Sequence, residues 1–180
     1  MIDPVNIVSE HASRAKKMLN IKCPVTVTVA KLYAPFAFSG PGRVWILGDW
    51  WSMFRVFRGE PHIPFSVLLY DVYHEMYHQW EKCYGYPVNE RAGDRFGFSM
   101  AARITRRKFN VDVSPDDIRD MFIDAVMQEH ERLYGDKFYA VCHLMELYVA
   151  MDRPYLIEHF IDDDPELRET KTVISLAGEE

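Results

Sequence analysis

The chain has 180 residues, of which 48% are hydrophobic and 27% charged, and its formal net charge at pH 7 is -6. That length and composition are typical of one globular domain with its own core, and they exclude a disordered chain. A general nucleic-acid binder presents a basic face, so the acidic balance argues against nucleic acid as a partner. No apolar run approaches the roughly 20 residues that a membrane-spanning helix needs. We therefore expect a single domain with no nucleic acid and no membrane among its partners.

The number and spacing of the cysteines bear on the cellular compartment of the protein. Cys23, Cys83 and Cys142 are odd in number and lack the spacing of a disulfide framework, and the sequence does not open on a secretory signal peptide. These observations predict a cytoplasmic protein with reduced cysteines. Cys83 follows His78 by five residues, an offset that points it away from the histidine on a helix. We interpret it as a small buried apolar side chain and not as a metal ligand.

The first third of the chain predicts one helix and a few short strands. Apolar residues recur at helical spacing from Asn6 to Leu19, whereas valine and threonine alternate from Pro24 to Leu32, as in a strand with one buried face. A second strand fits Arg43 to Gly48, with a third short piece around Phe36 to Ser39. Together they predict a small, mostly antiparallel sheet. The aromatic-rich stretch from Trp50 to Phe57 is interpreted as core, with a substrate-facing lid as the alternative.

Helices dominate the rest of the sequence. Four are predicted: Pro64 to Gly85, Asn89 to Phe109, a third capped by Ser114 or Asp116 and running to about Tyr134, and a fourth from Asp136 to about Met151. Strands followed by helices predict an α+β fold in which the helices pack on one face of the sheet. Residues 1–161 form this domain. The acidic stretch 162–180 is expected to be a frayed or partly docked C-terminal tail.

The helix predicted from Pro64 to Gly85 contains His74, Glu75 and His78, which make HEMYH an HExxH motif. Residues four apart lie on one face of a helix, so both imidazoles point at the same spot and form half of a zinc site. Glu75 lies beside that pair, where its carboxylate can accept a proton from a water molecule that zinc activates. A motif this short is not decisive alone, and a third ligand must be found.

Catalytic zinc takes three protein ligands and keeps one position open for water. No histidine follows His78 until His130, so the economical third ligand is a carboxylate from the next helix, which a short turn brings back alongside. Glu90 and Asp94 share a face of that helix. We assign Glu90 as the ligand and Asp94 as the partner of the second ring nitrogen of a ligating histidine. The alternative is a solvent-exposed charged face without metal.

Asp71 lies on the same helical face as the two histidines of the motif. It is a candidate for a fourth ligand or for a supporting group. A fourth protein ligand would close the open position of the metal, so we interpret Asp71 as a local partner or a surface carboxylate.

Two motifs together carry a family resemblance. HEMYH followed by NERAGDRFG resembles the gluzincin group of zinc metallopeptidases, in which HExxH is followed by a second motif of the form NExxSD or ExxxD. The second motif is close to that of the thermolysin family, with Gly93 in place of a serine. The short chain and the E-x-x-G-D-x-F-G run also resemble the ImmA/IrrE family of small regulatory metallopeptidases. The resemblance covers roughly residues 25 to 100.

The resemblance implies a zincin-like minimal domain and a role for each matching residue. It implies that the zinc ligands are His74, His78 and Glu90, that Glu75 is the general base, and that Asp94 supports a ligating histidine. It also implies that the strand RVWILG, from Arg43 to Gly48, is the edge strand beside the cleft, to which an extended peptide adds by backbone hydrogen bonds.

We therefore expect a zinc-dependent peptidase of narrow or regulatory specificity that acts on a peptide or protein substrate. One alternative is a zinc-stabilised, non-catalytic protein-binding module, and a second is a helical domain without metal. Glu75 favours the enzyme, because a structural zinc site has no use for a base there. The donor to the tetrahedral oxyanion stays open among five residues of the later helices: His130, Tyr134, Tyr139, His143 and Arg153. The sequence makes no prediction of oligomeric state.

Overall fold

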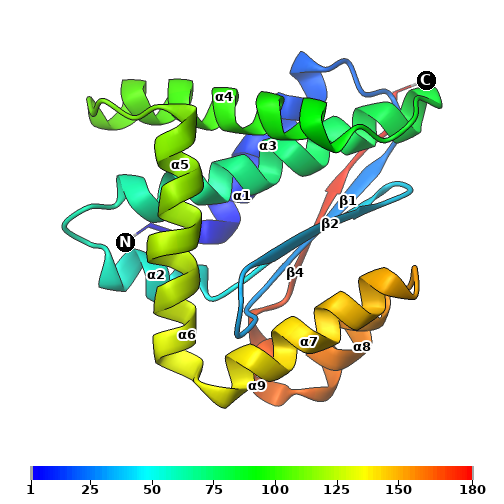
Figure 1. Ribbon diagram of the computed structural model, residues 1–180. Coiled ribbons are helices and arrows are strands. Elements are labelled where there is room, and N and C mark those ends of the chain that lie inside the picture. Colours follow the sequence, from blue (N-terminus) through cyan, green and yellow to red (C-terminus); the bar gives the residue numbers. More distant parts are fainter. Residues whose placement is uncertain (1, 180) are drawn as a thin grey trace.

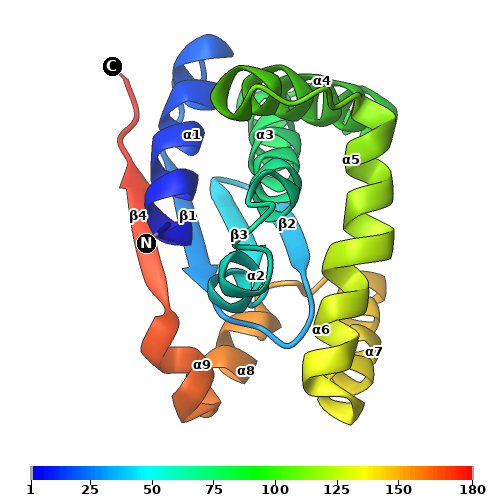
Figure 2. The same ribbon diagram turned by 90° about the vertical axis from the view of Figure 1, so that its left-hand side faces the viewer.

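The computed structural model, which describes residues 2–179 (Figure 1), contains one mixed sheet whose strands lie in the order β2-β3-β1-β4 (Figure 2). The three predicted strands are confirmed as β1 (Val25–Ala30), β2 (Phe36–Gly40) and β3 (Arg43–Leu47). β3 pairs antiparallel with β2 and parallel with β1, and β4 (Thr172–Leu176) pairs antiparallel with β1. Most of the pairings are thus antiparallel, and the fold is α+β, as expected.

The predicted helices are confirmed, and shorter ones join them. The long helices are α1 (Pro4–Met18), α3 (His62–Tyr84), α4 (Glu90–Phe109) and α7 (Asp136–Ala150). The third predicted helix is a continuous rod of α5 (Pro115–Met121), a π-helical stretch (Phe122–Met127) and α6 (Gln128–Tyr134). The short helices are α2 (Trp50–Val56), α8 (Leu156–Asp163) and α9 (Pro165–Thr170). Within residues 2–179 no helix is both long and apolar enough to span a membrane.

Helices cover both faces of the sheet (Figure 1), so the prediction that they pack on one face is wrong. Val27 and Val29 belong to a core shared with α1 and α3, whereas Trp45 and Leu47 belong to a second core shared with α7, α8 and α9. The alternation of valine and threonine in β1 concealed this second layer. Thr28 is only 3% exposed, because helices from the C-terminal part of the chain cover the face that threonine was expected to turn to water.

Within the C-terminal stretch 162–180, α9 and β4 are part of the fold, so of the two predicted alternatives the frayed tail is wrong and a docked segment is observed. β4 adds to the free edge of β1, with Val27 opposite Ile174. Just before it, the Lys31 backbone N–H donates to Thr170 Oγ1 at 2.8 Å. The acidic composition of residues 162–180 favoured a stretch exposed to solvent. An edge strand needs only one buried face, however, and the alternating residues of β4 provide it.

Cys23 and Cys83 form a disulfide, with their Cα atoms 5.8 Å apart, so the prediction of reduced cysteines and an unpaired Cys83 is wrong. The two cysteines are 60 residues apart in sequence, a separation from which no pairing can be read. The bond ties the segment before β1 to the last turn of α3. A disulfide is uncommon in the reducing cytosol, so it weighs against the cytoplasmic location predicted from the sequence.

Candidate metal centre

The turn between α3 and α4 brings the two halves of the sequence motif together. α3 ends at Gly85, whose φ of 74° is the left-handed conformation common at helix ends. Asn89 then caps α4, accepting a hydrogen bond from the Ala92 backbone N–H at 3.1 Å. Glu90 is the first residue of α4 and therefore returns to the middle of α3, where the histidines lie.

Two glycines of α4 let that helix approach the histidines closely. A Cβ atom at Gly93 would lie 3.0 Å from Cε1 and 3.2 Å from Nε2 of His78. A Cβ atom at Gly97 would lie 2.9 Å from the ring of Tyr70 and 3.1 Å from Cβ of His74. Larger side chains at these positions would push α4 away from α3 and withdraw Glu90 from the imidazoles.

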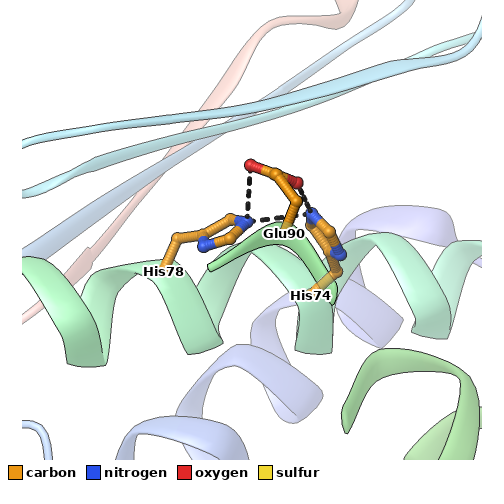
Figure 3. Close-up of side chains that lie close together, drawn as sticks. All are labelled: His74, His78 and Glu90. Carbon is orange, nitrogen blue, oxygen red and sulfur yellow. Dashed lines mark hydrogen bonds and ion pairs between the residues drawn. The ribbon is translucent and has the colours of Figure 1, made fainter. Parts of the chain in front are cut away.

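The structure brings His74, His78 and Glu90 into one group, and we call these three residues the candidate metal centre (Figure 3). The two Nε2 atoms are 3.0 Å apart. Each Nε2 is 3.2 Å from one oxygen of the Glu90 carboxylate, which lies between the two rings. Ligand atoms at the usual Zn–N distance in a tetrahedral site are about 3.3 Å apart. The spacing therefore suits one small divalent cation.

A carboxylate also lies next to the Nδ1 atom of each imidazole. His78 Nδ1 donates to Glu81 Oε1 at 2.6 Å, and Glu81 is only 2% exposed. His74 Nδ1 lies 3.0 Å from Asp94 Oδ1, close enough for an ion pair although the orientation is not that of a hydrogen bond. A carboxylate at Nδ1 favours the proton on that nitrogen and leaves the lone pair on Nε2. The lone pairs of both rings then converge on the Glu90 carboxylate.

Asp94 is thus where the sequence placed it, and Glu81 is a contact that the sequence reasoning missed. Besides holding His78, Glu81 accepts a hydrogen bond through Oε2 from the Asn89 backbone N–H at 2.7 Å. One buried carboxylate therefore joins the second histidine to the residue that caps α4. The signal for it was its spacing, three residues after His78 on the same face of the helix.

Glu75 is buried beside the centre, with Oε1 3.8 Å from His74 Nε2. Burial raises the pKa of its carboxyl, an effect that the nearby His74 opposes. The Ser39 hydroxyl of β2 donates to the Glu75 backbone carbonyl at 3.0 Å and fixes this turn of α3 against the sheet. A carboxyl with a raised pKa is suited to accepting and returning a proton near neutral pH.

Asp71 is neither a ligand nor a surface group. It lies outside the candidate metal centre and is 6% exposed, so the interpretation as a surface carboxylate is wrong. Its Oδ2 has no hydrogen-bond partner among the described residues. Burial, and to a smaller extent the charge of Glu75, raise the pKa of this carboxyl well above its usual range.

The candidate metal centre opens into a cavity of about 310 Å³. Its walls are β2, α3, the turn into α4, the end of α7 at Val149, and the link between α7 and α8 at Asp152 and Pro154. The implied edge strand is therefore misassigned: β3 lies inside the sheet between β2 and β1, and β2 is the edge beside the cavity. Although β2 lies between β1 and β3 in the sequence, it lies on the outer side of β3 in the sheet, an arrangement that the order of the strands in the sequence does not reveal.

The five candidate oxyanion donors do not line the cavity. His130 is fully buried, with its Nε2 accepting a hydrogen bond from the Asp49 backbone N–H at 2.8 Å. Tyr134 donates to the Asp49 carboxylate, and Tyr139 to Glu131. The other two, His143 and Arg153, are exposed and are likewise not among the residues that line the cavity.

Comparisons of the chain with protein-family models, with curated proteins and with solved structures found no match.

Proposed function

We propose that the protein is a zinc-dependent peptidase whose metal is held by His74, His78 and Glu90. One observation carries the proposal: two imidazole nitrogens, 3.0 Å apart and each backed by a carboxylate, face a third carboxylate. Electron-pair donors gathered in this way repel one another unless a cation or proton joins them. Two nitrogens and a carboxylate at the mouth of a cavity are the donor set of catalytic zinc sites with an open position.

Zinc at this centre would supply a Lewis acid that polarises a carbonyl group and makes a water molecule easier to deprotonate. Glu75, beside the centre, would accept the proton of that water and return it to the departing amine. The edge of β2 would hold an extended peptide across the cavity by backbone hydrogen bonds. Asp94 and Glu81 would keep the histidine rings oriented with Nε2 toward the cavity.

The first test is the metal itself. Elemental mass spectrometry of the purified protein should find about one zinc per chain, since one group of three ligand residues is present in the described residues. Absence of zinc after reconstitution would contradict the proposal and leave a helical domain without metal.

The second test separates a peptidase from a zinc-stabilised binding module. Glu75→Gln should keep zinc and lower hydrolysis of a peptide library, read by mass spectrometry, by about 100-fold or more. Glu146→Gln, an exposed residue of α7, is the matched control and should keep both zinc and activity. A Glu75→Gln protein as active as the parent would show that Glu75 is not the general base. A zinc protein that cleaves no peptide of the library would favour the binding module.

A further inference from the structure

The cavity at the candidate metal centre continues into a second one of about 460 Å³. Ser39, Lys82, Asp152 and Pro154 line both cavities, so the two form one groove. The second part runs past the turn between β2 and β3 and reaches Trp45. A peptide that crosses the centre along β2 would therefore extend into this part of the groove.

Lys82 is the one cationic side chain among the residues that line the first cavity. It follows His78 by four residues and His74 by eight, so all three lie on one face of α3. Its stem is half-buried, and its ammonium makes no ion pair or hydrogen bond with any residue in the described range 2–179. An ammonium on a rigid helix beside the centre is thus left without a protein partner.

Apart from the carboxylates at the centre itself, the other charges of the groove are placed differently. Arg43 is held by Glu158 at 3.0 Å and lies over the ring of Trp45. Asp152 is exposed, follows the last residues of α7, and makes no ion pair with Lys82. Lys82 is therefore the cation whose backbone is fixed relative to the metal ligands, whereas Asp152 belongs to the link that forms the opposite wall.

We propose that Lys82 binds a carboxylate of the peptide substrate, an inference that rests on the peptidase proposed for the same centre. The Cα atom of Lys82 is about 6 Å along α3 from that of His78, since four residues rise about 1.5 Å each. An extended peptide covers this distance in about two residues at roughly 3.3 Å each. The carboxylate therefore lies within about two residues of the cleaved bond, and it is either the C-terminal group or an Asp or Glu side chain.

Binding to a protein that cannot cleave its ligand tests this directly. The zinc-loaded Glu75→Gln protein is titrated into fluorescently labelled five-residue apolar peptides, and dissociation constants are read from fluorescence anisotropy. One peptide has a free C-terminus, one is amidated, and further amidated peptides carry a single Glu at each interior position. We expect at least one carboxylate peptide to bind about ten-fold more tightly than the amidated apolar one.

Variants at Lys82 then identify the partner. In the same Glu75→Gln background, Lys82→Met, which keeps an apolar stem, should remove the preference, and Lys82→Arg should restore most of it. Lys17→Gln on α1 is the control for loss of an exposed cation and should leave the preference unchanged. Asp152→Asn should not weaken the binding of the carboxylate peptide. Zinc content is measured for every variant, so a failed metal site is recognised separately.

Three results would overturn the proposal. Equal binding of carboxylate and amidated peptides, or binding of none of them to the zinc-loaded protein, would show that the groove selects no carboxylate. A preference that survives Lys82→Met would assign it to the metal or to another group. If the purified protein holds no zinc at all, the peptidase proposal fails first, and that outcome is read before any peptide is added.

Discussion

Buried histidines have different surroundings in two parts of the molecule, at the candidate metal centre on α3 and at His130 on α6. His130 is fully buried, and both of its ring nitrogens are satisfied by the protein backbone. Its Nδ1 donates to the Val126 carbonyl at 2.8 Å, and its Nε2 accepts from the Asp49 backbone N–H at 2.8 Å. Burial lowers the pKa of this imidazole and keeps it neutral.

The histidines of α3 are less completely satisfied: His78 Nδ1 donates to Glu81, whereas His74 Nδ1 lies 3.0 Å from Asp94 without the orientation of a hydrogen bond. Glu81 and Asp94 stand at their Nδ1 atoms, while the two Nε2 atoms face each other and Glu90 beside a cavity. A buried imidazole with one donor and one acceptor contact is a complete structural element. Two imidazoles whose Nε2 atoms converge need a further partner, and residues 2–179 of the protein do not supply one. That difference separates a packing histidine from a ligating one more sharply than burial does.

The largest effect is expected when one histidine is replaced in each of the two parts. His78→Ala should lose zinc, with a fall in affinity greater than the roughly 10-fold to 100-fold typical of an outer partner. His130→Gln should keep zinc but lower the free energy of unfolding by about 1–3 kcal/mol, because a buried hydrogen-bonded ring is removed. Elemental mass spectrometry and urea unfolding of the metal-free proteins measure the two quantities. Loss of zinc in His130→Gln alone would reverse the assignment.

A smaller effect is expected when a buried carboxylate is altered in each part. Glu81 and Asp49 are both 2% exposed, and each accepts a hydrogen bond from a backbone N–H next to a helix start. Glu81→Gln should weaken zinc binding about 10-fold to 100-fold, since its amide cannot both accept from His78 Nδ1 and accept from the Asn89 N–H.

Asp49→Asn is the matched control for Glu81→Gln. It should destabilise the fold through its contacts with α2 and Tyr134 without changing zinc affinity. Competition with a chelator of known affinity measures zinc binding in both variants. Equal affinities for Glu81→Gln and the parent would show that Glu81 packs against the centre without orienting it.

Local rules were enough to predict that His74, His78 and Glu90 lie together, whereas the rest of the structure depended on non-local contacts. The helical period places His74 and His78 on one face, and a short turn brings back Glu90, so all three follow from nearby sequence. Glu81 was within reach of the same rule and was overlooked. The partner of Cys83 and the strand β4 depend on segments that meet only in the folded chain.

Asp71 gives the smallest expected effect: its Oδ2 lacks a hydrogen-bond partner within residues 2–179, while both oxygens of Asp49 have one. Burial raises the pKa of Asp71 in the folded state above its unfolded value, with Glu75 adding to the shift. At pH values between those two, the native chain binds a proton that the unfolded chain has released. The free energy of unfolding therefore falls as the pH rises through that window.

Asp71→Asn removes this titration and should be more stable than the parent at neutral pH. The advantage should shrink as the pH is lowered through the ordinary pKa of an aspartate, about 3.9, because below it the parent carboxyl is protonated in both states. Urea unfolding of the zinc-free proteins at a series of pH values measures the difference. A difference that does not change with pH would mean that Asp71 is stabilised in its charged form by a contact equivalent to those of Asp49. In that case a carboxylate oxygen without a hydrogen-bond partner would not distinguish the surroundings of the candidate metal centre from those of His130.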